Sequence, residues 1–269
     1  MRDIKVAITG ACGRMSSTVL RNLLSQDDMR LIGAIEAPGH TGIGSDIGEL
    51  LGVGALGVRL SSDLEEVIRD ADVVVQFTNP KATIEHSRTC ADFGKATVIG
   101  TTGFSGEEEE RLRGILSGIA AVWSPNMSIG MNLLFKLVRE AASILGTDYD
   151  VEIVEMHHRF KKDAPSGSAM RLLKEAASGL GLDPNLSVVH GRSGIVGERP
   201  RAQIGVHAVR GGDVVGDHMV IFAGIGERIE LVHKASSRDA FAKGAIKAIR
   251  FVASAPPGIY GMEDVLGIS

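Results

Sequence analysis

Short apolar runs alternate with helical segments over the first 125 residues, and this alternation limits the fold more than any other feature of the sequence. Strands that alternate with helices in this way predict a parallel, doubly wound sheet of the α/β class. The glycine-rich stretch from Gly33 to Gly57 is expected to be an irregular surface excursion of this domain. The expected strands are Ile4–Thr9, Arg30–Glu36, Asp72–Phe77, Ala96–Gly100 and Ala121–Trp123, the expected helices are Arg14–Leu24 and Lys81–Phe93, and a capping box at Ser105–Glu108 opens another helix.

A glycine turn follows the first expected strand. Gly10 and Gly13 stand where a backbone can approach a pyrophosphate at the start of a helix, although Ile8 occupies the place of a first glycine. Glu36 ends the next strand, at the distance where an acid meets ribose hydroxyls. The alternatives are a tight turn without a ligand and a solvated surface acid. Turn and acid together favour a dinucleotide site.

Two further polar turns follow later strands. Gly100-Thr101-Thr102-Gly103 comes after the fourth strand, and the segment from Ser124 to Met127 comes after the fifth. Ligands of open α/β sheets bind at the carboxyl ends of the strands, so these turns suit the wall of a nicotinamide or substrate site. Ordinary strand-to-helix loops are the alternative.

The second half of the chain predicts an α+β domain with an open sheet, because its strands follow one another with glycine turns between them. Such a sheet needs its free face covered, which makes oligomerisation through this face an expectation. The expected elements are helix Met131–Leu145, strands Asp150–Met156, Ser187–His190, His207–Arg210, Val214–Ala223 and Arg228–His233, and a last helix Phe241–Phe251.

The stretch from Glu155 to Ser168 places two adjacent histidines, an arginine and two lysines directly before a helix start that Ser166 can cap. Cationic side chains beside free helix N–H groups predict an anion site, for a carboxylate or a phosphate. His157, His158 and Lys161 beside that anion can move protons near neutral pH.

These histidines have two other interpretations. Adjacent histidines on a strand point to opposite faces, so His157 and His158 rarely bind one ion, and no metal is expected. Hydrogen-bonded strand-end histidines without a function are the second alternative. Lys161, four residues past His157, favours catalysis. Arg159 and Lys162 are expected to form a solvated or substrate-steering surface.

Composition excludes several classes of protein. With 269 residues the chain should form one large or two medium domains. A net charge of −4 without a basic tract, and only 4% aromatic residues, argue against nucleic acid as a partner. The apolar runs are too short for a membrane span, and the chain enters a strand after three residues, so neither membrane nor signal peptide is expected. Cys12 and Cys90 form no disulfide framework, and a cytoplasmic location is expected.

Motifs along the whole chain resemble the 4-hydroxy-tetrahydrodipicolinate reductase (dihydrodipicolinate reductase) family. The block from Glu155 to Gly167 is highly specific, whereas the nucleotide motifs are generic. The matching segments are Gly10–Met15, Phe77–Pro80, Gly100–Phe104, Pro125–Asn132, Glu155–His158, Lys161–Gly167, His207–Arg210, Gly212–Asp213, Phe222–Arg228 and Tyr260–Gly267.

The resemblance implies NAD(P)H-dependent reduction of a cyclic dicarboxylate, 4-hydroxy-tetrahydrodipicolinate, to tetrahydrodipicolinate with loss of water, in lysine and diaminopimelate biosynthesis. It implies His157 as proton donor or acceptor and Lys161 as the catalytic lysine, without deciding which of them donates the proton. Substrate contacts are implied for His158, Gly167, Ser168 and Thr102. Cofactor contacts are implied for Gly10, Ala11, Cys12, Gly13, Arg14, Met15, Glu36, Gly100, Thr101, Thr102, Ser124, Pro125, Asn126 and Met127.

The family further implies a Rossmann-type dinucleotide-binding domain over 1–128 and 238–269, a substrate-binding and oligomerisation domain over 129–237, and a homotetramer. Ala37 departs from the arginine that many members carry for the 2′-phosphate, and an acid without a basic neighbour favours NADH. Ser16 replaces a third glycine, Ser168 a threonine and Phe160 a histidine. The alternatives are a reductase of another cyclic imine or oxo-acid, a dinucleotide-sensing protein that is not an enzyme, and a structural or assembly protein.

Overall fold

The computed structural model describes residues 3–268, which form two compact units. Unit 1 comprises the chain up to Ile129 and again from Phe241 onward, and unit 2 comprises Gly130–Ala240. The domain boundaries expected from the sequence, at 128/129 and 237/238, lie beside these bounds. The chain therefore leaves unit 1 once and returns to it near its last long helix.

Unit 1 is built on one sheet of seven parallel strands in the order β12-β6-β5-β4-β1-β2-β3. The strands are β1 (Ile4–Thr9), β2 (Met29–Ile35), β3 (Leu60–Ser61), β4 (Val73–Gln76), β5 (Ala96–Ile99), β6 (Ala120–Trp123) and β12 (Gly258–Tyr260). The order runs outward from β1 in both directions, so the expected doubly wound sheet is confirmed. Ligands of such sheets bind where the order reverses, outside the carboxyl ends of β1 and β4.

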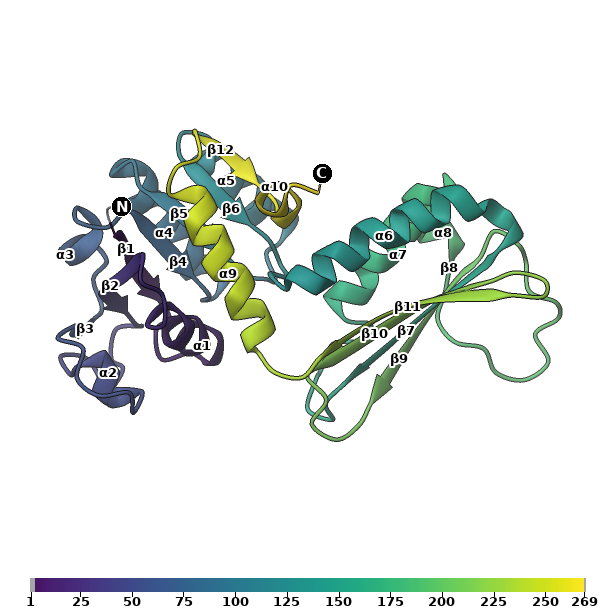
Figure 1. Cartoon of the computed structure of the whole chain (residues 1–269), viewed down its shortest axis with the longest axis horizontal. Helices are drawn as coiled ribbons and strands as arrows, with labels where there is room; N and C mark the ends of the chain where they lie inside the picture. Colours follow the sequence, from purple (N-terminus) through teal and green to yellow (C-terminus); the bar gives the residue numbers. More distant parts are fainter. Residues whose placement is uncertain (1–2, 269) are drawn as a thin grey trace. The chain divides into compact units, whose positions relative to one another are not determined.

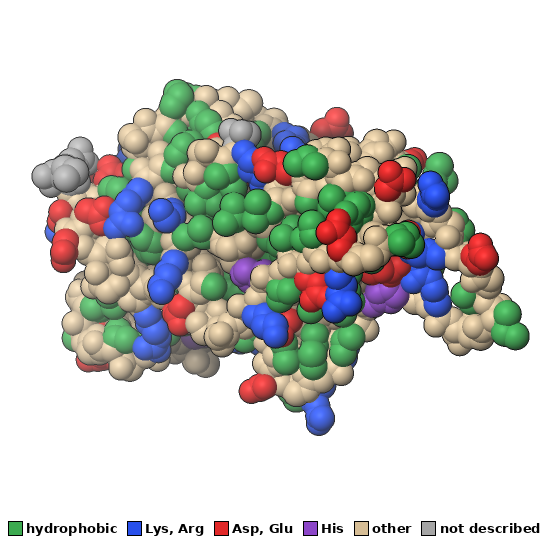
Figure 2. Space-filling view, turned by 45° about the vertical axis from the view of Figure 1, so that its right-hand side comes forward, with side chains coloured by type: hydrophobic (Ala, Val, Ile, Leu, Met, Phe, Trp, Pro, Cys, Tyr) green, Lys and Arg blue, Asp and Glu red, His purple; other side chains and the backbone are tan. Residues whose placement is uncertain are grey.

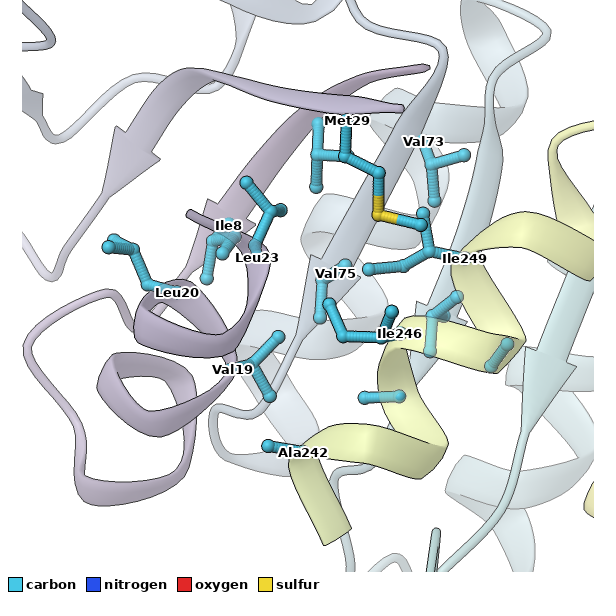
Figure 3. Packing of buried hydrophobic residues seen from close by; sticks show 14 of the residues in the cluster. Ile8, Val19, Leu20, Leu23, Met29, Val73, Val75, Ala242, Ile246 and Ile249 are labelled. Atoms are coloured by element: carbon cyan, nitrogen blue, oxygen red, sulfur yellow. The ribbon is translucent and has the colours of Figure 1, made fainter. Parts of the chain in front are cut away.

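Helices cover both faces of this sheet (Figure 1). Val73 and Val75 of β4 belong to a core with helices α1 and α9, while Val74 between them belongs to a second core with α4 and α5, as the alternation of strand side chains requires. Figure 3 shows the first core, in which side chains of α1 and α9 pack against one face of the strands. The helices are α1 (Arg14–Leu23), α2 (Ile47–Leu50), α3 (Glu65–Ile68), α4 (Pro80–Asp92), α5 (Gly106–Leu116), α9 (Asp239–Val252) and α10 (Met262–Leu266).

The glycine-rich stretch from 33 to 57 is more ordered than the irregular surface excursion expected from the sequence. Gly33 lies inside β2, where a Cβ would come within 2.6 Å of Val67 Cγ2, so glycine is needed for close packing. Helix α2 forms within the stretch because the Asp46 carboxylate accepts hydrogen bonds from Gly48 N (2.8 Å) and Gly57 N (2.7 Å). Elements α2, α3, β3, β12 and α10 were not expected, since each has at most five residues and little periodicity.

Unit 2 holds a mixed sheet of five strands in the order β11-β10-β7-β9-β8. Strand β10 is antiparallel to β7 and β11, whereas β7 and β8 are parallel to β9. The strands are β7 (Asp150–His157), β8 (Val188–Val189), β9 (Ile204–Arg210), β10 (Gly216–Ala223) and β11 (Arg228–Ala235); the helices are α6 (Ile129–Leu145), the 3-10 turn η1 (Gly146–Asp148), α7 (Gly167–Leu180) and α8 (Pro184–Ser187). The expected second α+β sheet is therefore confirmed.

Helices α6 and α7 lie on one face of this sheet (Figure 1). Val151 and Ile153 of β7 and Val220 and Phe222 of β10 are buried against these helices. Helix α7 approaches α6 closely at Gly179, where a Cβ would lie 2.5 Å from the backbone oxygen of Arg139. The alternate residues of β7 and β10 point to the other face.

Candidate active site

The glycine turn after β1 has the geometry of an anion cradle. Gly10 has a φ of +63°, and a Cβ there would lie 2.9 Å from Thr78 Cγ2 and 3.0 Å from Phe77 O, so only glycine fits. Gly13 N donates to Gly10 O at 2.8 Å, and Gly13 precedes α1. Gly13 and Arg14 are exposed, so the helix N-terminus and a guanidinium are available to an anion.

Glu36 lies directly beside this turn. Its Oε2 accepts a hydrogen bond from Cys12 N (3.0 Å) and its Oε1 accepts one from Ala37 N (2.9 Å), which fixes the carboxylate at the end of β2. Ser16, which replaces a usual glycine, is fully buried and donates its hydroxyl to Thr9 O at 3.0 Å. The serine is thus accommodated by a hydrogen bond between α1 and β1.

The polar turns expected at strand ends meet at one edge of the sheet. Strand residues Thr9, Gln76, Ile99 and Trp123 lie in register across β1, β4, β5 and β6, so the turns that follow them are neighbours. They contain the predicted cofactor residues Gly10, Ala11, Cys12, Gly13, Arg14, Met15, Gly100, Thr101, Thr102, Ser124, Pro125, Asn126 and Met127. The structure therefore brings these predicted residues together within unit 1.

A threonine network holds two of these turns. The buried Thr101 hydroxyl accepts a hydrogen bond from Thr78 N (3.1 Å) and contacts the Thr83 hydroxyl at 2.7 Å, and Thr83 in turn contacts the Thr78 hydroxyl at 2.8 Å. Thr101 thus supports the turn with its side chain, while the neighbouring Thr102 is exposed. A Cβ at Gly100 would lie 2.0 Å from the Phe77 ring, so this ring lies flush against the turn.

In unit 2, a buried carboxylate organises the end of β7. Glu155 is fully buried and accepts hydrogen bonds from His157 Nδ1 (2.7 Å), from Ser166 N (2.9 Å) and from both terminal nitrogens of Arg210 (2.7 and 2.8 Å). Burial alone would raise the pKa of Glu155, but the hydrogen bonds from Arg210, His157 and Ser166 lower it below the ordinary value. Glu155 is therefore an ionised anchor of this region.

The two histidines and the lysine lie where the sequence predicted them, at and after the end of β7. Burial lowers the pKa of His157, although Glu155 opposes this shift. Lys161 Nζ lies 2.9 Å from Asp163 Oδ2, with a fifth of the lysine side chain exposed. His158 Nδ1 is buried and has no hydrogen-bond partner among residues 3–268. Asp163 is well exposed, so a substrate carboxylate can replace it as the partner of Lys161.

The helix start at which the sequence predicted an anion site is present, as the N-terminus of α7. The Ser166 hydroxyl accepts a hydrogen bond from Ala169 N at 3.2 Å, which confirms Ser166 as the cap. The first turn of α7 contains no acidic residue, and Gly167 is exposed. The 14-residue helix directs its dipole toward Gly167 and Ser168.

A third histidine lies behind these residues and was not predicted. His218 of β10 is only 4% exposed; its Nε2 lies 3.2 Å from the Ser166 hydroxyl, and its ring packs edge to face on His157 with centroids 5.3 Å apart. Burial, together with nearby His157, lowers the pKa of His218 to about 4. His218 is thus uncharged at neutral pH.

The residues predicted from the sequence thus form two groups, one in each unit, and further residues that were not predicted hold them in place. The residues without a predicted role are Thr78 and Thr83 in unit 1 and Glu155, Arg210 and His218 in unit 2. Charge on the inward face of an alternating strand was an available signal for Glu155, because a buried charge is rarely unpaired.

Other classes of site gain no support from the described part of the chain. Residues 3–268 contain no group of three or more histidine, cysteine or acidic side chains placed to hold a metal ion. Among the same residues, no helix combines the length and apolar character that crossing a membrane requires. On the face drawn in Figure 2, the described lysines and arginines lie singly or beside acidic residues.

Two family models cover nearly the whole sequence. Residues 4–127 match the N-terminal part of dihydrodipicolinate reductase and residues 130–266 match its C-terminal part. The chain belongs to this family. The resemblance inferred from the motifs is confirmed, and with it an oxidoreductase family of lysine and diaminopimelate biosynthesis.

Individual relatives agree over full length. A 4-hydroxy-tetrahydrodipicolinate reductase of Methanothermobacter thermautotrophicus is 53% identical, with 99% of this chain and 100% of the relative covered. One of Methanocaldococcus jannaschii is 48% identical, with 99% and 98% covered. A solved dihydrodipicolinate reductase of Paenisporosarcina sp. TG-14 with bound dipicolinate matches with a TM-score of 0.76 and 27% identity, covering 96% of this chain and 97% of that one. The chain thus matches its relatives from end to end.

Proposed function

We propose that the chain reduces 4-hydroxy-tetrahydrodipicolinate to tetrahydrodipicolinate with NADH or NADPH and loss of water, and that His157 and Lys161 handle the proton. The observation that supports this most strongly is in unit 2, where Lys161 and His157, whose ring is held by a carboxylate, precede the exposed N-terminus of α7. The activity named for the full-length relatives supports the same reaction.

The substrate is a cyclic dicarboxylate, and cationic groups and helix amides suit its two charges. We assign one carboxylate to the amides of Gly167 and Ser168 at the start of α7, and we place His158 and Lys161 beside the substrate. Bound dipicolinate, itself a cyclic dicarboxylate, in the Paenisporosarcina relative supports this class of ligand. Thr102, exposed at the sheet edge of unit 1, stays a proposed contact of both substrate and cofactor.

Proton transfer is the chemistry that the chain's own residues perform. When bound, the reduced nicotinamide supplies the hydride, which is one proton with two electrons, to the substrate ring. The hydroxyl leaves as water together with a proton released from the neighbouring ring carbon, so this loss is balanced within the substrate. One further proton must reach the substrate to complement the hydride. The Lys161 ammonium carries a transferable proton, whereas His157 is held by Glu155 through Nδ1. Either group can serve as the donor.

The glycine turn at the start of α1 suits a dinucleotide, because exposed Gly13 leaves the helix N-terminus open to a phosphate. Gly10 and Gly100 let the turns pack closely, since a Cβ at either position would collide with Thr78 or Phe77. Glu36 beside the first turn suits ribose hydroxyls, and Ala37 supplies no positive charge for a 2′-phosphate. We therefore propose NADH as the better cofactor.

The Ala37→Arg variant tests the cofactor assignment. A guanidinium beside the 2′-phosphate forms a charge-assisted hydrogen bond of about 1.5–3 kcal/mol, so kcat/KM for NADPH should rise about tenfold or more relative to NADH. Steady-state rates with both cofactors give this ratio, and Ala37→Met controls for side-chain length without charge. A wild-type preference for NADPH, or an unchanged ratio in Ala37→Arg, would contradict the assignment.

We also propose that the sheet of unit 2 assembles the chain into a homotetramer. The face opposite α6 and α7 has an apolar centre, formed by Val154, Met156, Val209, Met219, Ile221 and Val232, with charged residues such as Glu152 and Asp217 around it. Val209 and Val232 are more than 40% exposed, which is unfavourable for a face left in water.

Light scattering coupled to size exclusion tests this assembly. We expect a mass four times that of the 28.4 kDa chain. Val232→Glu should reduce the mass because it buries a charge in the proposed interface. Val53→Glu, at an exposed residue of unit 1, is the control and should keep the wild-type mass. A monomeric wild type would contradict the proposal.

A cytoplasmic location is proposed from the activity and from the two cysteines. Cys12 and Cys90 are free thiols, as is usual for proteins of reducing compartments. Burial raises the pKa of Cys90 to about 12, which keeps this thiol protonated and unreactive.

A further inference from the structure

Four N–H donors saturate the buried carboxylate of Glu155. Its Oε1 accepts from Ser166 N (2.9 Å) and Arg210 Nη2 (2.8 Å), and its Oε2 accepts from Arg210 Nη1 (2.7 Å) and contacts His157 Nδ1 at 2.7 Å. A carboxylate has about four acceptor positions, so these contacts account for its full capacity. The fully buried side chain has no exposure to water that could replace any of them.

This arrangement decides which nitrogen of His157 carries the proton. An ionised carboxylate can only accept, so His157 Nδ1 must be the donor, and Nε2 of the uncharged ring keeps its lone pair. A Cβ at Gly216 would lie 3.0 Å from this Nε2. Any side chain at position 216 would therefore crowd the nitrogen that can exchange a proton with a ligand.

The same pair also fixes the chain between β7 and α7. Ser166, whose N–H bonds to Glu155, is the cap of α7, so the carboxylate determines where the Gly167 and Ser168 amides begin. Arg210 Nη2 additionally donates to Asp163 O at 2.8 Å. One carboxylate–guanidinium pair therefore holds the histidine ring, the helix start and the loop that carries Lys161.

We propose that Glu155 and Arg210 are positioning residues. They hold His157 in the Nδ1–H tautomer and fix its position relative to the start of α7, where the anion binds. The inference rests on the proposed roles of His157 and α7 in the reductase reaction. Glu155 acts on the proton-carrying ring and Arg210 acts mainly on the loop and the helix start. Their loss should therefore have different kinetic signatures.

The tautomer of wild-type His157 is the first test and needs no perturbation of Glu155. The full-length protein is labelled with ¹⁵N-histidine, and long-range ¹H–¹⁵N spectra are recorded at pH 8. The His157 signals are those missing in His157→Gln. We expect Nδ1 to be protonated and Nε2 to be bare. An Nε2–H tautomer, or an exchanging mixture, would overturn the proposal.

Glu155→Gln is the second test, because a carboxamide can donate to Nδ1 as well as accept from it. We expect loss of the single tautomer, a fall in kcat of about 10–100-fold, as is typical when the orienting partner of a functional histidine is removed, and a shift to lower pH of the limb of the pH profile that reports His157. The shift follows because Glu155 raises the pKa of His157, although burial lowers it more.

Glu152→Gln is the matched control. Glu152 lies on the same strand but on the opposite face, and it too is held by arginines and a histidine, namely Arg192, Arg199 and His207. This variant should leave the His157 tautomer and the pH limb unchanged. Equal shifts of the pH limb in both variants would show a general loss of structure and would overturn the proposal.

Arg210→Lys keeps a positive charge near Glu155 but removes the pair of guanidinium nitrogens that bind both carboxylate oxygens. We expect KM to rise about tenfold, roughly the net worth of a charge-assisted hydrogen bond, while the His157 tautomer is retained. If Glu155→Gln does not fold, Arg210→Lys and the wild-type spectrum together test the positioning roles. A changed His157 tautomer with an unchanged KM in Arg210→Lys would contradict the proposal. Unchanged kcat in His157→Gln would remove the proposed catalytic role alone, because the tautomer measurement does not depend on turnover.

Discussion

Replacing Lys161 with alanine is expected to lower kcat by about 10²–10⁴-fold, the range typical of a lost general acid or base. Lys161 lies on the loop after β7, with its ammonium 2.9 Å from Asp163 and a fifth of its side chain exposed. It is thus accessible to substrate and paired with an exposed carboxylate that a substrate carboxylate can replace. Cofactor binding should be unchanged, because the glycine turn and Glu36 belong to unit 1.

Lys162→Ala is the matched control for this experiment. Lys162 is the next residue and is exposed, so its loss removes the same formal charge from the same loop. We expect kcat to change little and KM to rise only slightly. Turnover can be followed by nicotinamide absorbance and cofactor binding by nicotinamide fluorescence. Unchanged kcat in Lys161→Ala, or equal losses in both variants, would contradict the catalytic assignment.

Stability of unit 2 is expected to fall as pH falls from about 6.5 to about 4, because His218 is buried in the uncharged form. An unfolded chain protonates histidine near pH 6.5, whereas folded His218 has a pKa of about 4. Between these values the unfolded state binds more protons, so the free energy of unfolding decreases with decreasing pH. A difference of about 2.5 units, at about 1.36 kcal/mol per unit, amounts to about 3 kcal/mol.

Several groups around His218 contribute to this shift besides burial. His157 and Lys161 oppose its protonation by charge, as does His233, which is paired with it in register, whereas Glu155 favours it. The Ser166 hydroxyl contacts its Nε2. His157 and His233 also have pKa values lowered by burial, so they add to the loss of stability in the same direction below pH 6.5.

Urea unfolding followed by circular dichroism at several pH values and one protein concentration measures this effect. His218→Leu removes the titrating group, so its free energy of unfolding should depend less on pH than that of the wild type by up to about 3 kcal/mol across the window. His190→Leu, at an exposed histidine, is the control and should keep the wild-type dependence. Identical pH dependence in His218→Leu and wild type would contradict the interpretation.

The larger elements could be predicted because their signals are local. The run Ile4–Thr9 and the turn at Gly10 predict β1 and its anion cradle from residues adjacent in sequence. Elements such as α3 and β12 are too short for periodicity to reveal, and they depend on packing against distant strands. The prediction of an irregular stretch from 33 to 57 missed α2 for the same reason, since the Asp46 carboxylate orders this stretch by accepting hydrogen bonds from Leu56 N and Gly57 N.

The residues of the candidate site likewise divide into those predictable from local sequence and those brought together by strand pairing. His157 and Lys161 stand four residues apart next to a helix start, so their chemistry could be inferred from local sequence. Arg210 lies 55 residues from Glu155, and the two meet only because β9 is parallel to β7 and ends beside it. His218 is brought opposite Glu155 by the antiparallel register of β10. Such pairings depend on strand register, which the sequence pattern alone did not define.

The most direct test of the account is the loss of absorbance at 340 nm when the protein is mixed with reduced nicotinamide cofactor and freshly generated 4-hydroxy-tetrahydrodipicolinate. NADH and NADPH are measured separately, with and without the cyclic substrate. We predict oxidation that requires the substrate and is faster with NADH. Cofactor binding without substrate-dependent oxidation of either cofactor would contradict the proposed reaction and would favour a dinucleotide sensor or a reductase of another substrate.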